Sequence, residues 1–237
     1  MTERGRRWVQ RSAHEFVVGP SRLAWDGGGL TIDIDEIGAP LPQRVRGRVR
    51  VMPQATTGFV AALDAAGRHR WGPIAPRARV EVSLDAPALR WAGDGYLDSN
   101  EGDEPIGRPF RSWDWSRSPL ADGSTAVVYD VRRRTGPDHV IAQRFAPDGR
   151  PQAFEPPPRQ ALASSRWRIV RRMRHDGAGG PAAVQQTLED TPFYARSLVA
   201  SGLFGERVES VHETLSVPRL EAASTRLMLP WRMPRRG

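Results

Sequence analysis

Two segments of alternating nonpolar and polar residues constrain the fold of this chain more than any other feature of its sequence. Residues 30–37 read LTIDIDEI, and residues 44–51 read RVRGRVRV. A period of two is typical of a β-strand with one face toward a core and the other toward solvent. Because a Pro- and Gly-containing stretch at 38–43 separates the segments, we expect the two strands to pair across a turn.

The two segments carry opposite charges, which we expect to neutralise one another. The polar face of the first carries Asp33 and Asp35, and the polar face of the second carries an arginine row, Arg44, Arg46, Arg48 and Arg50. Opposite charges across a pair of strands contribute about 0.2–1 kcal/mol per pair. We therefore interpret the row as a solvated face balanced by its neighbour. The same pairing argues against a metal site at Asp33, Asp35 and Glu36.

Strand signals continue along the rest of the chain, and helical patterns are scarce. Gly-containing turns such as Asp122-Gly123 and Asp148-Gly149 separate the segments. We expect one short helix at 219–229, ended by Pro230. Further strands are expected at 15–18, 22–25, 80–84, 88–91, 125–131, 140–145, 167–172, 184–188, 195–200 and 208–215. Many short strands with Gly and Pro turns predict an all-β protein of antiparallel sandwiches or barrels.

The composition limits the classes of function. The net charge is +8 and all 35 basic residues are arginine, but they are spread along the chain, so nucleic-acid binding is not predicted. There is no cysteine, which excludes disulfides and thiolate metal sites. No apolar run reaches the roughly 18 residues of a membrane span, and the first residues lack the apolar core of a signal peptide. We expect a cytoplasmic location.

Two pairs of residues in alternate positions carry the clearest chemistry. His69 and Trp71 form one pair, and Tyr96 and Asp98 form the other. In extended backbone, both members of a pair project from the same face. An acid, an imidazole, an indole and a phenol suit acid-initiated chemistry on an electron-rich apolar substrate.

Trp113-Asp114-Trp115 offers a second aromatic and acidic set. If extended, it places both indoles on one face and the carboxylate on the other, so we interpret the indoles as core or pocket wall. The motifs HExxH, GxSxG and GxxxxGK[ST] are absent, which argues against zinc hydrolases, serine hydrolases and P-loop nucleotide sites.

Several runs carry a family resemblance across almost the whole chain. The longest are HRWGPIAPRARVEVSLDAPALRWAGDGYLDSNEGDEP at 69–105 and SWDWSRS at 112–118, and shorter ones are MTERGR, TPFYARS, HETLSV and LMLPWRMPR. Together they resemble the bacterial carotenoid 1,2-hydratases, also called hydroxyneurosporene synthases.

The resemblance implies lipocalin-like antiparallel β-barrel or sandwich domains in tandem. In relatives of this kind, MTERGR lies well inside the protein. Residues 1–87 are then expected to be the C-terminal part of a first domain that is incomplete in this chain. Residues 88–237 are expected to form a second domain with a short C-terminal helix.

The resemblance also implies a reaction. It is the addition of water to the terminal C1–C2 double bond of acyclic carotenoids such as neurosporene and lycopene, within photosynthetic pigment synthesis, and it needs no cofactor or metal. The family positions implicated in catalysis match His69, Trp71, Tyr96 and Asp98. Because an Asp in water has a pKa of about 3.9, an acid at Asp98 must have its pKa raised by burial.

The roles expected of the four residues follow from this chemistry. Asp98 is expected to protonate C2, and the π faces of Trp71 and Tyr96 to stabilise the cation at C1. His69 is expected either to orient Asp98 or to act as the base toward water.

Two alternatives remain open. One is a cyclase of isoprenoid or polyene substrates with the same fold. The other is a non-catalytic binder of apolar ligands or an inactive truncated relative. Because the substrate is insoluble in water, peripheral membrane contact is expected, through Arg132–Arg134 or through the tail at 232–236. The sequence carries no signal for oligomeric state.

Overall fold

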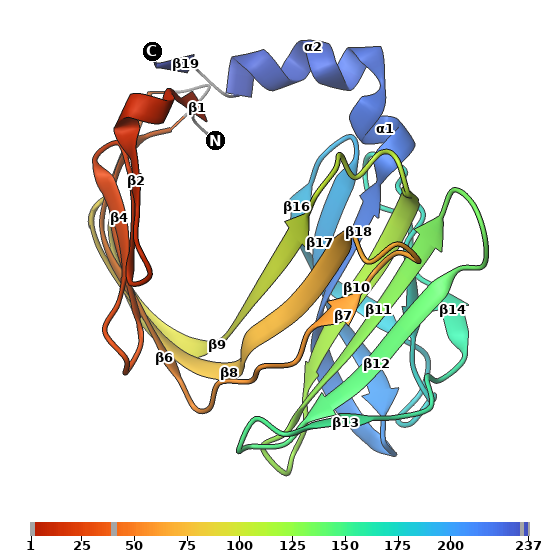
Figure 1. Ribbon diagram of the computed structural model, residues 1–237. Coiled ribbons are helices and arrows are strands. Elements are labelled where there is room, and N and C mark those ends of the chain that lie inside the picture. Colours follow the sequence, from red (N-terminus) through yellow and green to blue (C-terminus); the bar gives the residue numbers. More distant parts are fainter. Residues whose placement is uncertain (1–2, 39–41, 233–234, 237) are drawn as a thin grey trace. The chain divides into compact units, whose positions relative to one another are not determined.

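The computed structural model describes residues 3–38, 42–232 and 235–236, and its described part is mostly antiparallel β-sheet (Figure 1). The chain divides into two compact units, each built from separated stretches. The first unit comprises the chain up to Ala55, Arg77–Leu97 and the chain from Arg226. The second unit comprises Thr56–Pro76 and Asp98–Thr225. Because most of the described elements are strands, the all-β expectation is confirmed.

The N-terminal part of the chain forms several short strands followed by two long ones, β8 and β9. Their bounds are β1 (Glu3–Arg4), β2 (Val9–Arg11), β3 (Glu15–Val18), β4 (Ser21–Trp25), β5 (Leu30–Ile37), β6 (Arg44–Pro53), β7 (Ala61–Ala62), β8 (His69–Ala86) and β9 (Ala88–Gly102), with a 3-10 turn at Arg6–Trp8. The sheet order is β2-β3-β4-β5-β6-β8-β7, and β9 pairs with β8. The neighbouring pairs along the path from β2 to β7 are antiparallel.

The pairing of β5 with β6 follows the expected charge ladder. Asp33 stands opposite Arg48, and its Oδ1 accepts a hydrogen bond from Arg48 Nε at 2.6 Å. Asp35 stands opposite Arg46 but is bound by the neighbouring Arg44, with Nη2 to Oδ2 at 2.9 Å. The predicted strands and their mutual neutralisation are confirmed.

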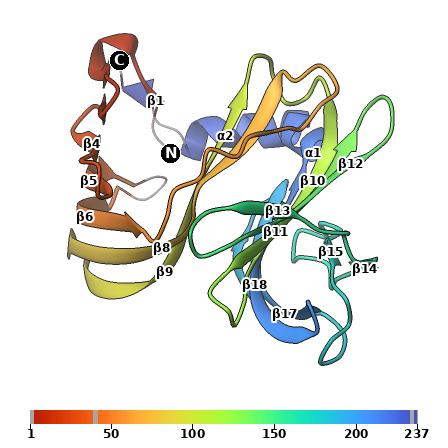
Figure 2. The ribbon, with the colours of Figure 1, turned by 60° about the horizontal axis from the view of Figure 1, so that its bottom comes forward.

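The second unit is built on a seven-stranded antiparallel sheet. Its strands are β10 (Phe110–Pro119), β11 (Thr125–Arg133), β12 (His139–Phe145), β13 (Pro151–Ala153), β16 (Ala183–Asp190), β17 (Tyr194–Leu203) and β18 (Glu206–Ser216). The order β13-β12-β11-β10-β18-β17-β16 is an open path, with β10 and β18 paired although far apart in sequence. A separate hairpin, β14 (Arg159–Ala161) with β15 (Arg172–Arg174), lies beside one face of this sheet (Figure 2). Leu162 and Met173 of this region pack on Val199 of β17.

Two local expectations are wrong. Residues 167–171 are not a strand, and β15 begins only at Arg172. A tight turn precedes it: Arg168 has a positive φ of 58°, and its N–H donates to Ser165 O at 2.9 Å. The expected helix at 219–229 is instead two helices, α1 (Val217–Glu221) and α2 (Ala223–Arg232). The extended conformation of Ala222 separates them, and Pro230 falls inside α2.

Two further features complete the description of the chain. The last described residues form β19 (Arg235–Arg236), which pairs in parallel with β1. No helix among the described residues is long and apolar enough to cross a membrane.

The expected domain boundary at residues 87 and 88 coincides with the turn between β8 and β9. The division into 1–87 and 88–237 stays a prediction.

Candidate functional site

The predicted site residues lie on β8 and β9. His69 and Trp71 begin β8 and are fully buried in the second unit, with 3% and 0% of their surface exposed. Asp98 of the same unit is half-buried in β9. Tyr96 is the alternate residue before Asp98 in the strand and belongs to the stretch of β9 assigned to the first unit.

A hydrogen bond joins two of the predicted residues. The indole Nε1 of Trp71 donates to Oδ2 of Asp98 at 2.9 Å. Because an indole N–H can only donate, it fixes Oδ2 as an acceptor in either protonation state of the carboxyl group. A protonated Asp98 can carry its proton on Oδ1 while Oδ2 accepts the indole N–H. The structure thus brings Trp71 and Asp98 together, and this hydrogen bond orients the Asp98 carboxyl group.

Aromatic rings surround this acid group on the side of Trp71. Phe59 and Tyr129 each meet the Trp71 ring edge to face, with centroids 6.0 and 5.8 Å away. Trp113 continues the cluster, 6.3 Å from Tyr129 and 6.1 Å from Phe110. Edge-to-face rings at such distances pack favourably. The carboxyl group therefore stands at the edge of an apolar wall.

His69 is held by protein oxygens at both ring nitrogens. Its Nδ1 lies 2.8 Å from Asp64 Oδ2, and its Nε2 lies 2.8 Å from the carbonyl oxygen of Glu104. The ring also packs on Phe110 at 4.9 Å. Neither nitrogen is directed at Asp98, so the geometry favours a positioning role for His69 over a role as base toward water.

Asp64 is the partner of His69 that sequence reasoning missed. Its carboxylate accepts hydrogen bonds from the backbone N–H groups of Ala66, Arg68 and His69, in addition to the His69 ring. Burial favours a higher pKa, but the hydrogen bonds from His69, Arg68 and Ala66 outweigh it and hold the pKa of Asp64 below its usual value. The signal in the sequence is an Asp followed by the small residues Ala65, Ala66 and Gly67, a pattern typical of an Asx turn.

Tyr129 is a second residue that sequence reasoning missed. It is 3% exposed, and its hydroxyl donates to Asn100 Oδ1 at 3.4 Å. Burial first, and then the charges of Asp98 and Glu213, raise the pKa of Tyr129, so the phenol stays protonated. Its position in the expected strand at 125–131 was the signal that the sequence offered.

Trp113, Asp114 and Trp115 lie in β10, and the conditional expectation for them is confirmed. Trp113 faces Tyr129, whereas Asp114 points to the opposite face of the sheet. There Asp114 accepts a hydrogen bond from Thr214 Oγ1 at 2.6 Å and pairs with Arg159 at 3.0 Å. Asp114 is thus a buried structural carboxylate, away from the aromatic cluster.

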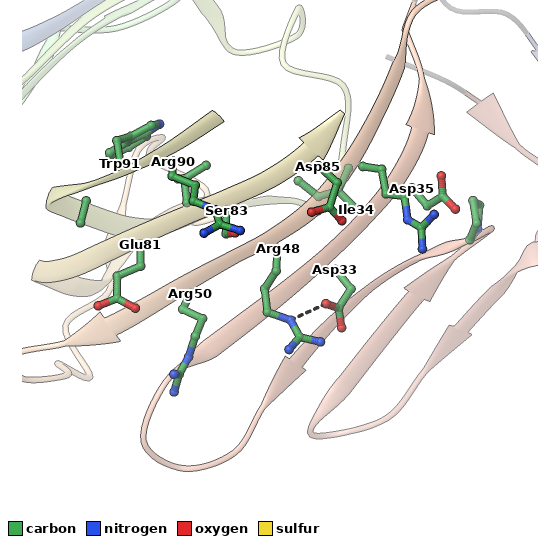
Figure 3. A pocket seen from close by; sticks show the side chains of 15 residues that line it. Asp33, Ile34, Asp35, Arg48, Arg50, Glu81, Ser83, Asp85, Arg90 and Trp91 are labelled. Carbon is green, nitrogen blue, oxygen red and sulfur yellow. Dashed lines mark hydrogen bonds and ion pairs between the residues drawn. The ribbon is translucent and has the colours of Figure 1, made fainter. Parts of the chain in front are cut away.

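Three arginines of the row line a groove of the first unit, shown in Figure 3, with a volume of about 900 Å³. Arg46, Arg48, Arg50 and Arg90 line it together with an equal number of carboxylates, Asp33, Asp35, Glu81 and Asp85. The groove is therefore balanced in charge, which agrees with the structural interpretation of the row. The described residues contain no cluster of three or more His, Asp or Glu side chains suited to a metal ion.

The Arg132–Arg134 segment is not a free basic loop. Arg133 belongs to β11 and donates twice to the carbonyl oxygen of Leu63, at 3.1 and 3.0 Å. Arg134 donates to the carbonyl of Gly107 and pairs with Glu221 at 2.7 Å. These contacts argue against membrane contact through this segment. The side chains of the tail at 232–236 lie outside the described residues.

Comparison with known proteins gives one family along the whole chain. The family model for the carotenoid hydratase CrtC matches residues 1–237. The acyclic carotenoid 1,2-hydratases of Rubrivivax gelatinosus and Thiocapsa roseopersicina are 64% and 52% identical to the whole chain. The chain spans 58% of the length of each of these two relatives. It covers 84% of the acyclic carotenoid 1,2-hydratase of Cereibacter sphaeroides, at 39% identity.

A solved structure shares the fold. The crystal structure of a putative AttH from Nitrosomonas europaea superposes with a TM-score of 0.55 and 13% identity. The match covers 89% of this chain and 72% of that one. At this identity the likeness concerns the fold alone.

Proposed function

The chain belongs to the carotenoid hydratase CrtC family, and from this premise we propose that it adds water to the terminal C1–C2 double bond of acyclic carotenoids such as neurosporene and lycopene. The product is a 1-hydroxy carotenoid, and the enzyme class is a hydro-lyase. We place the reaction in carotenoid biosynthesis. The finer fold that we propose is two lipocalin-like domains in tandem, with residues 1–87 in the first and 88–237 in the second.

The single observation that carries the proposal is the hydrogen bond from Trp71 to Asp98 at the edge of the aromatic cluster. Protonation of an unactivated alkene needs an acid held beside an apolar surface. In the proposed reaction, Asp98 gives its proton to C2 from Oδ1, and positive charge develops on the more substituted C1. Water then attacks C1.

The other three predicted residues have supporting roles. Trp71 holds the carboxyl group through its N–H, and its aromatic neighbours favour the cation electrostatically. Tyr96 is proposed to add a further aromatic face. His69 is proposed to fix the start of β8, and with it Trp71, through Asp64 and Glu104.

The test supplies lycopene or neurosporene in membranes to the chain and to an Asp98→Asn variant, with products identified by mass. The amide oxygen of Asn still accepts the Trp71 N–H, so the variant should keep its fold. The expected result is a product heavier by one water from the wild-type chain and none from the variant. Turnover retained in Asp98→Asn, with unchanged circular dichroism, would remove Asp98 as the acid.

Because the substrate is a long apolar polyene, we also propose peripheral contact with a membrane surface from the cytoplasmic side. Leu89 and Trp91 at the start of β9 support it, since 47% and 50% of their surfaces are exposed, and Arg90 lies between them. Flotation with anionic vesicles tests the idea. Replacing both apolar residues by serine should lower the bound fraction, and equal flotation of variant and wild type would refute this contact.

A further inference from the structure

We propose that Asn100 and Tyr129 hold the water molecule that captures the cation, an inference that rests on the proposed hydration and extends it. Neither residue is among the four positions that the family resemblance implicates. Both lie in the second unit, with Asp98 and Trp71.

The position of Asn100 suits a water site. It is the second residue after Asp98 in β9, so both side chains leave the strand on the same face. With a rise of about 3.3 Å per residue, the two side chains start about 6–7 Å apart. Asn100 is exposed, whereas Asp98 is half-buried. A water bound at Asn100 can therefore be replaced from bulk solvent.

Tyr129 supplies the buried side of the same site. Its hydroxyl reaches Asn100 Oδ1 at 3.4 Å, which is long for an O–H···O hydrogen bond. A water molecule that bridges the two groups makes shorter hydrogen bonds to each of them. Because the phenol stays protonated, it remains available as a hydrogen-bond donor.

The spacing matches the reaction. Reacting atoms approach to about 3–3.5 Å before bonds form. A double bond flanked by an acid on one carbon and a water on the other fits between groups that start about 6–7 Å apart. The rings of Trp71 and Trp113, 5.8 and 6.3 Å from Tyr129, enclose the apolar side. Because Asn100 is exposed, bulk water can reach the site from its side.

The step balances without any other reactant. The π electron pair of the double bond forms the new C2–H bond with the proton of Asp98, which becomes a carboxylate. A lone pair of the bound water forms the C1–O bond. The proton that this oxygen releases returns to the Asp98 carboxylate, so the acid is regenerated and one water has been added.

Deuterium labelling separates protonation from water capture. The full chain is incubated in D₂O with lycopene in membranes, and both the product and the recovered substrate are examined by mass spectrometry. If Asn100→Ala or Tyr129→Phe loses only the water site, the cation still forms and returns to alkene by losing a proton from C2. Hydration should fall about tenfold, the loss of roughly one hydrogen bond to the attacking water, while recovered substrate gains deuterium at C2.

Two control variants and the wild-type chain make the outcomes distinguishable. Ser99→Ala, next to Asn100 on the other face of the strand, should hydrate as the wild type does, and Asp98→Asn should show neither hydration nor exchange. A fall of both hydration and exchange in Asn100→Ala would overturn the water site. Unchanged hydration in both Asn100→Ala and Tyr129→Phe would overturn it as well. If Tyr129→Phe does not fold, Asn100→Ala alone decides the question, because Asn100 is exposed. A wild-type chain that neither hydrates nor exchanges would refute the proposed function itself, and the water site with it.

Discussion

The carboxylate of Asp64 accepts two hydrogen bonds from His69, one from the backbone N–H and one from ring Nδ1, both at 2.8 Å. These two hydrogen bonds connect the loop before β8 to the first residue of the strand. Because the ring also meets the carbonyl oxygen of Glu104, His69 joins this loop to the chain that follows β9. The position of Trp71, two residues later, depends on these contacts.

Asp64→Asn should destabilise the second unit by about 2–3 kcal/mol at neutral pH, because an amide accepts at only one of its two atoms and leaves buried donors without a partner. Urea unfolding measures the change. Asp103→Asn is a matched control, since Asp103 is exposed and its ion pair with Arg70 is long at 3.4 Å. Equal stability of the two variants would contradict the role given to Asp64.

The same carboxylate should contribute to acid sensitivity. Its pKa is lowered in the folded state, so its stabilisation is complete above the unfolded pKa of about 4 and is lost as pH falls through the folded value. The stability difference between wild type and Asp64→Asn should therefore narrow below about pH 4. A constant difference down to pH 2 would show that ionisation of Asp64 does not contribute.

Trp71→Phe should lower kcat about tenfold with little change in KM, because it keeps an aromatic ring but removes the N–H that holds Asp98. Trp113→Phe is the control, since it removes the same indole volume from the same cluster. Steady-state hydration rates of the two variants make the comparison. An equal loss in both would mean that packing, and not the hydrogen bond, is responsible.

Gly102→Ala should disturb His69 directly. A Cβ at this position would lie 2.8 Å from His69 Cδ2 and 3.1 Å from Nε2. Because the ring is held at both nitrogens, it has little freedom to move, and we expect a loss of about 1–3 kcal/mol. Gly58→Ala should be close to neutral, since nothing lies within 4 Å of the added atom. Thermal unfolding distinguishes the two, and a stable Gly102→Ala would show that the contact relaxes cheaply.

The sequence predicted those features that depend on neighbours along the chain. The alternation at β5 and β6 placed Asp33 opposite Arg48, and the W-D-W run placed Asp114 away from both indoles, because a strand repeats every two residues. The places of Tyr129 and Asp64 were not predictable in this way. Tyr129 reaches the site through the pairing of β11 with β10, and Asp64 through a turn, and neither relationship leaves a periodic signal.

The errors in prediction have local causes. The apolar and charged residues at 167–172 favoured a strand. Instead there is a turn at Arg168, closed by a hydrogen bond from the Arg168 N–H to Ser165 O. The C-terminal helix is interrupted because Ala222 adopts an extended conformation, which intrinsic helix propensity does not anticipate.

His212 should make the second unit less stable in mild acid. It is 1% exposed, and its Nε2 donates to the carbonyl of Arg172 at 2.8 Å. Burial lowers its pKa, although the nearby charge of Asp114 and the bond to Arg172 oppose the shift. A histidine with a lowered folded pKa binds fewer protons when folded, so its stabilisation is complete above the unfolded pKa of about 6.5 and is lost as pH falls below it.

The expected slope between about pH 6.5 and 5 is up to about 1.4 kcal/mol per pH unit for His212. His175 and His139, whose pKa values burial also lowers, add to it. His212→Gln keeps an N–H donor for Arg172 but does not titrate, so denaturant unfolding across this range should show a shallower slope. His14→Gln changes an exposed histidine and serves as the substitution control. A slope as steep in His212→Gln as in the wild type would assign the acid sensitivity to other groups.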